Sequence, residues 1–339
     1  MQTKVEKITP ESLEYAKEII LGGGVVAIPT ETVYGLGGNA FDDLAVKKIF
    51  EVKGRPADNP LIAHVHPDYD LSSIIDYEPP YAKKLRDAFC PGPLTLVYPS
   101  KNKVSPLVSC GLNTLAVRIP SHAGAQALLR SVNIPVVAPS ANVSKHVSPT
   151  SAKHVFDDFN GKIPLILDGG VSTGGIESTV CDVTGEVPMI LRPGLITKEM
   201  IEGVCGTCLT CEPTVKKGGQ AKSPGMLYKH YSPRCETRLY QDDQVSLAFA
   251  DYEKESASGK KVVLLCEHDV YTKAVEKGFN AIDLGALDKE MAANLYAALR
   301  DAELIAELLI AIEPKEKSGV MVGVLNRLIK ACKSQDIAH

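Results

Sequence analysis

Two polar clusters near the start of the sequence could hold an anionic small molecule. The first is the hydroxyl-rich stretch 29–36 (PTETVYGL), which follows the apolar run 25–28. The second is Lys53 and Arg55, which flank a glycine where a helix over 43–53 is expected to end. Arginine presents a planar fork and lysine a point charge, and both suit phosphate or carboxylate groups. The ordinary alternative is a strand-to-helix loop with helix-end cations, but the loop is about twice the usual 2–6 residues. Its length favours a site.

Later polar residues also follow apolar strands. Ser140 and Asn142 come after a strand over 135–138 and could donate hydrogen bonds, although such residues are also common in turns. Arg118 and Arg192 stand at the ends of apolar strands, where a buried guanidinium is costly without an anionic partner. The two arginines therefore predict two anionic groups.

Three other patterns are weaker. Residues 35–40 (GLGGNA) fit the dinucleotide fingerprint, but they do not directly follow the strand and lack the acidic residue about 20 positions on. His64 lies late in a strand, where a histidine is more often structural than catalytic. Cys205, Cys208 and Cys211 have spacing compatible with zinc or an iron–sulfur cluster, with Cys235 as a distant fourth ligand. Three reduced, partly buried thiols remain the favoured interpretation.

Composition indicates a globular protein. The chain has 339 residues, of which 45% are hydrophobic and 23% charged, and this length suggests two domains. The net charge of −4 argues against polyanion binding by the whole protein but permits a local basic groove. Nine cysteines in a long chain fit a reducing compartment, and residues 1–8 lack the apolar core of a signal peptide. No membrane span is expected, because the apolar segment 304–312 is too short. These features predict a cytoplasmic protein.

The elements that must position these residues alternate between strands and helices. The first 200 residues predict a mixed α/β sheet rather than strict βαβ repetition, because several strands follow one another without room for a helix. The expected strands are 25–28, 61–65, 94–98, 115–119, 135–138, 164–167, 179–183 and 189–191, and the expected helices are 11–21, 43–53, 80–89, 123–131 and 151–159.

A smaller second α/β domain follows a polar, glycine-rich linker. Strands are expected at 261–265, 281–284 and 319–323, the last running into a helix over 325–333. Helices are expected at 270–278 and, as one long amphipathic element, at 287–312. Three strands alternating with helices predict a Rossmann-like sheet.

Long motifs in a fixed order resemble one family. The sequence resembles the YrdC/Sua5 family of threonylcarbamoyl-AMP synthases, in its long two-domain Sua5 form. The resemblance implies a YrdC-like catalytic domain at 1–211 with a twisted mixed open sheet, a linker and lid at 212–234, and a C-terminal Sua5 domain at 235–339. The motifs are PTETVYGLGGNA, KGRPADNPLIAHV, PGPLTLV, AVRIPSH, APSAN, SPTSA, IESTVCDV, ILRPG and, at 223–233, SPGMLYKHYSP.

The resemblance implies a nucleotidyltransferase reaction. L-threonine, bicarbonate or CO2, and ATP would give L-threonylcarbamoyl-AMP and pyrophosphate, with Mg2+ accompanying ATP. The product would pass to a separate tRNA threonylcarbamoyl transferase complex that modifies adenosine 37, so that RNA contact with this chain would be weak at most. No membrane partner is implied.

The same resemblance assigns roles to individual residues. By motif, the catalytic residues would be Lys53, Arg55, Ser140 and Asn142; the threonine-binding residues Thr32, His64, Arg118 and Ser178; and the ATP-binding residues Arg55, Asn59, Thr114, Ser140, Ser148, Arg192 and, from the linker, Tyr231. The cysteine cluster is not a family hallmark, and no metal ligand is assigned.

Two other functions compete with this one. A carbamoyltransferase that forms a carbamoyl-adenylate uses a YrdC-like domain, but such chains carry added acylphosphatase, zinc-finger or kinase-like domains that this sequence lacks. A non-catalytic RNA-binding module would need salt-sensitive RNA binding despite the net charge of −4.

Overall fold

The computed structural model describes residues 2–211 and 231–332. The chain divides into two compact units, each described here by itself. The first comprises Met1–Ser144 and Ser148–Tyr228, and the second comprises Lys145–Val147 and Lys229–His339. Of the linker and lid expected at 212–234, residues 212–230 lie outside the described residues. Within the described ranges, no helix combines the length and the apolarity that a bilayer crossing needs.

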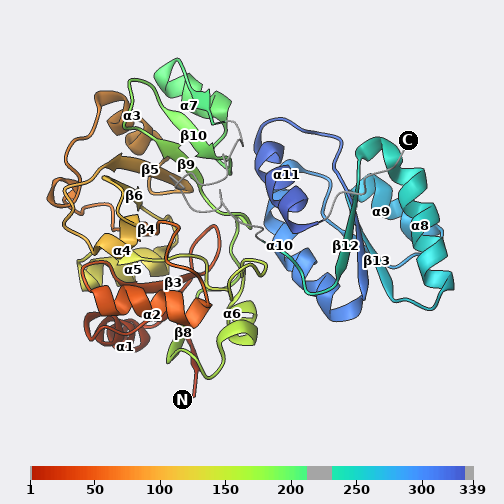
Figure 1. Ribbon diagram of the computed structural model, residues 1–339, viewed down its shortest axis with the longest axis horizontal. Helices are drawn as coiled ribbons and strands as arrows, with labels where there is room; N and C mark the ends of the chain where they lie inside the picture. The colour runs from red at the N-terminus through yellow and green to blue at the C-terminus, as the bar shows by residue number, and fades with distance from the viewer. Residues whose placement is uncertain (1, 212–230, 333–339) are drawn as a thin grey trace. The chain divides into compact units, whose positions relative to one another are not determined.

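A mixed sheet of eleven strands forms the first unit (Figure 1). Its strand order is β1-β8-β2-β3-β7-β4-β6-β5-β9-β10-β11, with both parallel and antiparallel pairs, as expected for a mixed α/β domain. The strands are β1 (Lys4–Lys7), β2 (Val26–Ile28), β3 (Gly35–Asn39), β4 (Ile62–His64), β5 (Leu94–Pro99), β6 (Thr114–Arg118), β7 (Val136–Val137), β8 (Leu165–Asp168), β9 (Thr179–Asp182), β10 (Met189–Arg192) and β11 (Leu209–Thr210).

Helices cover both faces of this sheet. The side chains of β2 alternate between the two faces. Val26 and Ile28 pack on one face with residues of α1 and α5. Ala27 packs on the other face with residues of α2, α3 and α6. The helices of this unit are α1 (Pro10–Leu21), α2 (Asp43–Lys53), α3 (Pro80–Phe89), α4 (Pro106–Ser109), α5 (Ala123–Val132), α6 (Ala152–Phe159) and α7 (Lys198–Cys205), with a short 3-10 turn, η1 (Leu71–Ser73).

The glycine-rich segment 35–40 is a strand and not a phosphate-binding loop. Strand β3 pairs antiparallel with β2 and β7. A Cβ atom on Gly37 would lie 3.1 Å from a methyl group of Val136, and one on Gly38 would lie 3.1 Å from Ile49. The glycines here allow close packing of the sheet, which explains the fingerprint-like spacing without a dinucleotide.

The second unit contains a four-stranded parallel sheet in the order β12-β15-β13-β14. Helices α8 and α9 lie on one side and α10 and α11 on the other, which is the layered arrangement of a Rossmann-like domain (Figure 1). The elements are β12 (Glu236–Tyr240), η2 (Asp242–Gln244), α8 (Val245–Ala257), β13 (Val262–Cys266), α9 (His268–Glu276), β14 (Ala281–Asp283), α10 (Asp288–Ile305), β15 (Leu308–Ile312) and α11 (Val320–Ala331).

Two expected elements of this unit were wrong. The helix expected over 287–312 ends at Ile305, and Leu308–Ile312 forms the fully buried strand β15 between β12 and β13. A short apolar run cannot be assigned to a strand or a buried helix from periodicity alone. The strand expected over 319–323 is instead the start of α11, where Met321, Val324 and Leu328 are buried on one face. Burial in the fold overrides the strand preference of the valines.

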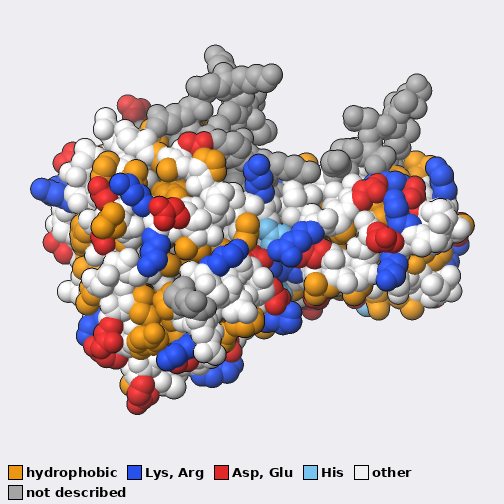
Figure 2. Space-filling view, turned by 60° about the horizontal axis from the view of Figure 1, so that its bottom comes forward, with side chains coloured by type: hydrophobic (Ala, Val, Ile, Leu, Met, Phe, Trp, Pro, Cys, Tyr) orange, Lys and Arg blue, Asp and Glu red, His pale blue; other side chains and the backbone are white. Residues whose placement is uncertain are grey.

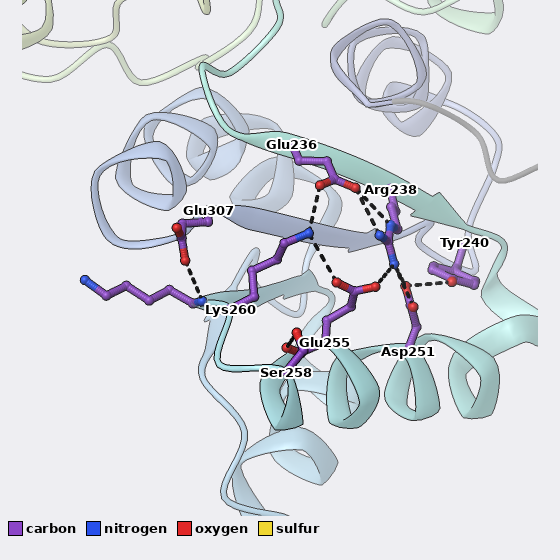
Figure 3. Close-up of polar contacts among 9 residues, drawn as sticks. Glu236, Arg238, Tyr240, Asp251, Glu255, Ser258, Lys260 and Glu307 are labelled. Carbon is purple, nitrogen blue, oxygen red and sulfur yellow. Dashed lines mark hydrogen bonds and ion pairs between the residues drawn. The ribbon is translucent and has the colours of Figure 1, made fainter.

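An ion-pair network joins one edge of this sheet to α8 (Figure 3). The Nη1 atom of Arg238 lies 2.7 Å from Asp251 and 3.0 Å from Glu255, while its Nη2 atom lies 3.0 Å from Glu236. Lys260 bridges Glu236 and Glu255 at 2.9 and 3.2 Å. These charges therefore fix β12 against α8.

Candidate active site

Two predicted residues stand side by side at the ends of parallel strands. His64 ends β4, Arg118 ends β6, and the two are register partners. On the other side of β6, Thr95 of β5 is the antiparallel partner of Arg118. All three side chains are buried. The sheet therefore places an imidazole, a guanidinium and a hydroxyl in one row.

The loop after β2 supplies the partners of Arg118. Its Nη1 atom donates to Thr32 Oγ1 at 2.8 Å, and its Nη2 atom donates to Glu31 Oε1 at 2.8 Å. Its Nε atom donates a longer bond, 3.4 Å, to the Gly92 carbonyl. Arginine has five N–H donors, and these contacts use three of them. A buried guanidinium with spare donors is suited to a carboxylate ligand.

Burial and the neighbouring cation keep His64 neutral. Burial, followed by repulsion from Arg118, lowers the pKa of His64 to about 3, from a usual value of 6.5. The Nδ1 atom lies 3.2 Å from the Ile62 carbonyl. The imidazole is therefore an uncharged hydrogen-bonding group at neutral pH.

Two hydroxyl groups lie between the strand ends that carry Arg118 and the second buried arginine. Thr95 Oγ1 lies 2.8 Å from Ser178 Oγ, one residue before β9. Arg192, at the end of β10, donates to the Ser178 carbonyl through Nε at 3.2 Å and through Nη2 at 3.0 Å. The strand order therefore brings together two arginines that are 74 positions apart in the sequence.

Lys53 is buried against the segment that carries Ser140 and Asn142. Its Nζ atom donates to the carbonyl of Ser140 and, at 2.7 Å, to the carbonyl of Asn142. Burial, with a further contribution from Arg55, lowers the pKa of Lys53 well below its usual value, although Asp158 and Glu177 oppose the shift. Helix α2 ends at Lys53, whose side chain is buried, and is capped by Gly54, whose φ of 59° is left-handed. In its protonated form Lys53 has three donors, so that one remains for a ligand.

Asn59 has a buried side-chain amide suited to binding a ligand. Its backbone carbonyl accepts a hydrogen bond from Arg55 Nη2 at 2.9 Å. Its side chain is 1% exposed, yet both the amide nitrogen and the amide oxygen have no hydrogen-bond partner among the described residues. Buried amide atoms are normally paired, so a ligand is expected to complete this site.

Three other predicted ATP ligands occupy different surroundings. Ser148 is buried and donates to Glu177 Oε1 at 2.6 Å. Thr114 begins β6, next to Asn113, which helps to line a cavity of about 280 Å3. Tyr231 belongs to the second unit, where its buried ring stacks on Tyr296 with the centroids 5.4 Å apart.

The structure thus connects many of the predicted residues through hydrogen bonds and strand pairing. One set comprises Thr32, His64, Arg118, Ser178 and Arg192, and a second comprises Lys53, Ser140 and Asn142. Sequence reasoning missed Glu31, Thr95 and Glu177, which partner these residues. Glu31 and Glu177 lie within the motifs PTETVYG and IESTV. Their positions directly before Thr32 and Ser178 could have indicated that they belong to the site.

The cysteines of the cluster are not joined by disulfides. Cys208 is buried, and Cys205 and Cys211 are half-buried. Burial raises the pKa of Cys208 to about 11, which disfavours the thiolate that binds metals. Among the described residues, no group of three or more His, Cys, Asp or Glu side chains could hold a metal ion.

Comparison with known proteins identifies the family. A family model described as "Telomere recombination", for the Sua5, YciO and YrdC proteins, matches residues 18–194, and one described as "Threonylcarbamoyl-AMP synthase, C-terminal domain" matches residues 196–332. The chain is 42% identical over 331 residues to the threonylcarbamoyl-AMP synthase of Pyrococcus abyssi, with 96% of this chain and 95% of that protein covered. The chain belongs to the Sua5 family of threonylcarbamoyl-AMP synthases. This confirms the resemblance found in the sequence motifs.

Other Sua5 relatives agree in sequence and in fold. The threonylcarbamoyl-AMP synthase of Bacillus subtilis is 41% identical over 310 residues, covering 91% of this chain and 89% of that protein. The crystal structure of P. abyssi Sua5 complexed with L-threonine superposes with a TM-score of 0.87 at 41% identity, covering 97% of this chain and 96% of that one. The two-domain α/β fold expected from the sequence is therefore confirmed.

Proposed function

We propose that this Sua5 family member condenses L-threonine, bicarbonate or CO2, and ATP into L-threonylcarbamoyl-AMP and pyrophosphate. The observation that carries the proposal is the row of buried polar residues at neighbouring strand ends: Arg118 bonded to Thr32, Thr95 beside Arg118 in register, and Ser178 bonded to Thr95 and Arg192. This row contains two buried guanidinium groups, and an amino acid and a nucleotide together supply a carboxylate and phosphates that such groups bind. Adenylation also makes the chain an enzyme of the nucleotidyltransferase type, as its family implies.

The amino acid would occupy the Arg118 side of this row. Arg118 has two N–H donors beyond its contacts to Thr32, Glu31 and Gly92, and a carboxylate can accept both. Neutral His64 and the hydroxyl of Ser178 stand nearby as hydrogen-bonding groups for the threonine hydroxyl. Threonine would therefore be held by charge at one end and by hydrogen bonds at the other.

The nucleotide would occupy the side of Lys53, Arg55 and Asn59. The unpaired amide of Asn59 and the remaining donor of Lys53 suit phosphate oxygens. Arg192, Thr114 and Ser148 would complete the ATP contacts from neighbouring strands and loops. The role assigned to Tyr231 remains a prediction from its motif.

The chemistry needs alignment more than acid–base catalysis. The threonine amine captures CO2 to form a carbamate, whose oxygen then attacks the α-phosphorus of ATP while pyrophosphate leaves. Lys53 would hold the Ser140–Asn142 segment in place through its two carbonyl contacts and stabilise developing negative charge with its third donor. Its burial strengthens that interaction, because water does not screen it.

Mg2+ is expected to arrive with ATP. This ion usually keeps waters and phosphate ligands and takes only one or two carboxylates from the protein. Glu177, whose charge acts on Lys53, is the carboxylate best placed to share the ion. When bound, Mg2+ would neutralise charge on the leaving pyrophosphate.

The product would pass to a separate tRNA threonylcarbamoyl transferase complex that modifies adenosine 37. Stable RNA binding by this chain is not required for that transfer. Figure 2 shows Lys and Arg side chains interspersed with Asp and Glu on the visible face of each unit, consistent with the net charge of −4. We expect any RNA contact of this chain to be weak and sensitive to salt.

Pyrophosphate release tests the proposal. We expect release only when threonine, bicarbonate and ATP are all present, and omission of any one should abolish it. Release with bicarbonate and ATP alone would favour a carbamoyl-adenylate transferase instead. Salt-sensitive RNA binding without any pyrophosphate release would favour an RNA-binding module.

A further inference from the structure

Glu31 is a buried carboxylate in the site to which neither the sequence motifs nor the proposed reaction assigned a role. The surrounding loops fix its backbone, because its carbonyl accepts a hydrogen bond from Gly174 N at 2.6 Å. A Cβ atom at Gly174 would lie 2.9 Å from that same carbonyl, so only glycine allows this close approach. Glu31 is therefore held rigidly beside Thr32.

The two oxygens of this carboxylate have different surroundings. Oε1 lies 2.8 Å from Arg118 Nη2. Oε2 is also buried but has no hydrogen-bond partner among the described residues. The side chain as a whole is 12% exposed. One oxygen thus orients Arg118, and the other remains available inside the site.

Glu31 is ionised at neutral pH. Burial raises its pKa, but the charge and hydrogen bond of Arg118, helped by the backbone amides of Glu31 and Ser121, outweigh burial and lower the pKa. A buried anionic oxygen without a donor costs free energy, so a ligand that brings a donor would be favoured. The best donor is a cation, because charged hydrogen bonds are about twice as strong as neutral ones.

An α-amino acid fits this pair of side chains. It carries an anionic carboxylate and a cationic ammonium on one carbon, and Arg118 and Glu31 present the opposite charges side by side. We propose that Glu31 Oε2 binds the ammonium group of the incoming amino acid, while Arg118 binds its carboxylate. Glu31 is then a specificity-determining residue that selects α-amino acids over hydroxy acids of the same shape. This inference rests on the proposed function.

Binding of two ligands separates this role from a purely structural one. L-Threonine and 3-hydroxybutyrate differ by the amino group, and both carry the carboxylate and the hydroxyl. We expect Glu31→Gln to lower the ratio of threonine affinity to 3-hydroxybutyrate affinity at least tenfold, measured by isothermal titration calorimetry. An equal loss for both ligands would overturn the proposal, because Glu31 would then act only by orienting Arg118. An unchanged ratio with no loss would overturn it as well.

A matched control uses a half-buried Glu–Arg pair of this unit. Glu78 contacts Arg86 at 2.8 Å, and Glu78→Gln should leave the affinity ratio unchanged. If Glu31→Gln fails to give a cooperative thermal unfolding transition, Glu31→Asp is tested instead. Aspartate keeps the charge but is shorter, so it should lower the ratio at least threefold, and a wild-type ratio would refute the proposal. Failure of the wild-type protein to bind threonine would instead refute the proposed function.

Discussion

His64 and Arg118 are register partners on the parallel strands β4 and β6, so that an imidazole is buried beside a guanidinium. Burial and this cation together lower the pKa of His64 to about 3. A positively charged side chain at position 64 would place two cations side by side in the core. The neutral state of His64 thus follows first from its burial and second from the guanidinium on the paired strand.

This pairing predicts an acid-side loss of stability. Unfolded His64 would titrate near 6.5, so between pH 6.5 and about 3 the unfolded state binds more protons than the folded state. The contribution of His64 is therefore complete above pH 6.5 and is lost as the pH falls, by at most about 1.4 kcal/mol per pH unit. His64→Gln should flatten the plot of unfolding free energy against pH, measured by urea denaturation between pH 4 and 8. The exposed control His268→Gln should keep the acid-side loss.

Arg118→Ala should raise the threonine requirement much more than the ATP requirement. It removes the proposed carboxylate partner, and loss of a charged hydrogen-bonded pair in a buried site costs about 2–5 kcal/mol. The KM for threonine should therefore rise at least 30-fold in pyrophosphate-release assays, with the KM for ATP changing less than threefold. The exposed Arg130→Ala on α5 is the control and should match the wild type. A larger effect on ATP than on threonine would contradict the assignment.

Lys53→Ala should slow turnover while threonine binding is largely kept. The substitution removes the donor to the Ser140 and Asn142 carbonyls and the donor proposed to stabilise transition-state charge. Loss of one such donor lowers turnover by about 10²–10³-fold. Turnover is measured by pyrophosphate release and threonine affinity by calorimetry. Lys48→Ala on the exposed side of the same helix is the control. Collapsed threonine binding with persistent turnover would refute the role.

The sequence predicted the first unit well because its signals were local. Helix α3 was expected over 80–89 and spans Pro80–Phe89, and each expected strand of this unit lies within two residues of an observed one. Strand β3 was missed because its glycines lack strand propensity and are required by packing against Val136 and Ile49. In the second unit, β15 was missed because a buried apolar run follows a helix with only two residues between them.

The sequence predicted many of the site residues but not the contacts between them. Arg118 and Arg192 were expected to need anions, yet only the sheet order shows that Thr95 and Ser178 lie between their strand ends. Glu31 could not be assigned from local pattern, since its meaning depends on Arg118, which is 87 positions away. Long-range pairing of this kind leaves no periodic trace in the sequence.

The ion-pair network of the second unit predicts a loss of stability in Arg238→Met (Figure 3). This guanidinium contacts Asp251, Glu255 and Glu236, and its removal leaves three carboxylates facing one another. The network is 13–46% exposed, so solvent screening limits the cost to about 1–3 kcal/mol. The thermal unfolding midpoint should fall accordingly, and the exposed control Lys254→Met on α8 should leave it unchanged. An unaltered midpoint in Arg238→Met would show that the network contributes nothing measurable.

Glu303 should matter for activity although no site motif contains it. Within the second unit, its carboxylate lies 2.9 Å from His146 and accepts a hydrogen bond from Arg234 N at 2.9 Å, while Arg300 donates to the Val147 carbonyl at 2.6 Å. These contacts hold the segment Lys145–Val147, which belongs to the second unit. In the sequence, this segment lies between the predicted site residues Asn142 and Ser148. Glu303→Gln should therefore loosen this segment and lower turnover about three- to tenfold, whereas the exposed control Glu276→Gln should not.

The same contact has a defined pH dependence. Burial raises the pKa of Glu303, but the hydrogen bonds from His146 and Arg234 outweigh burial and lower it below 4.5. The folded state thus binds fewer protons than the unfolded state, so the stabilisation is complete above pH 4.5 and is lost as the pH falls through the lowered pKa. Amide hydrogen exchange of 145–147, compared at pH 7 and pH 4, should show loss of protection at the lower pH in the wild type. In Glu303→Gln protection should already be low at pH 7, and full protection there would rule out this anchoring role.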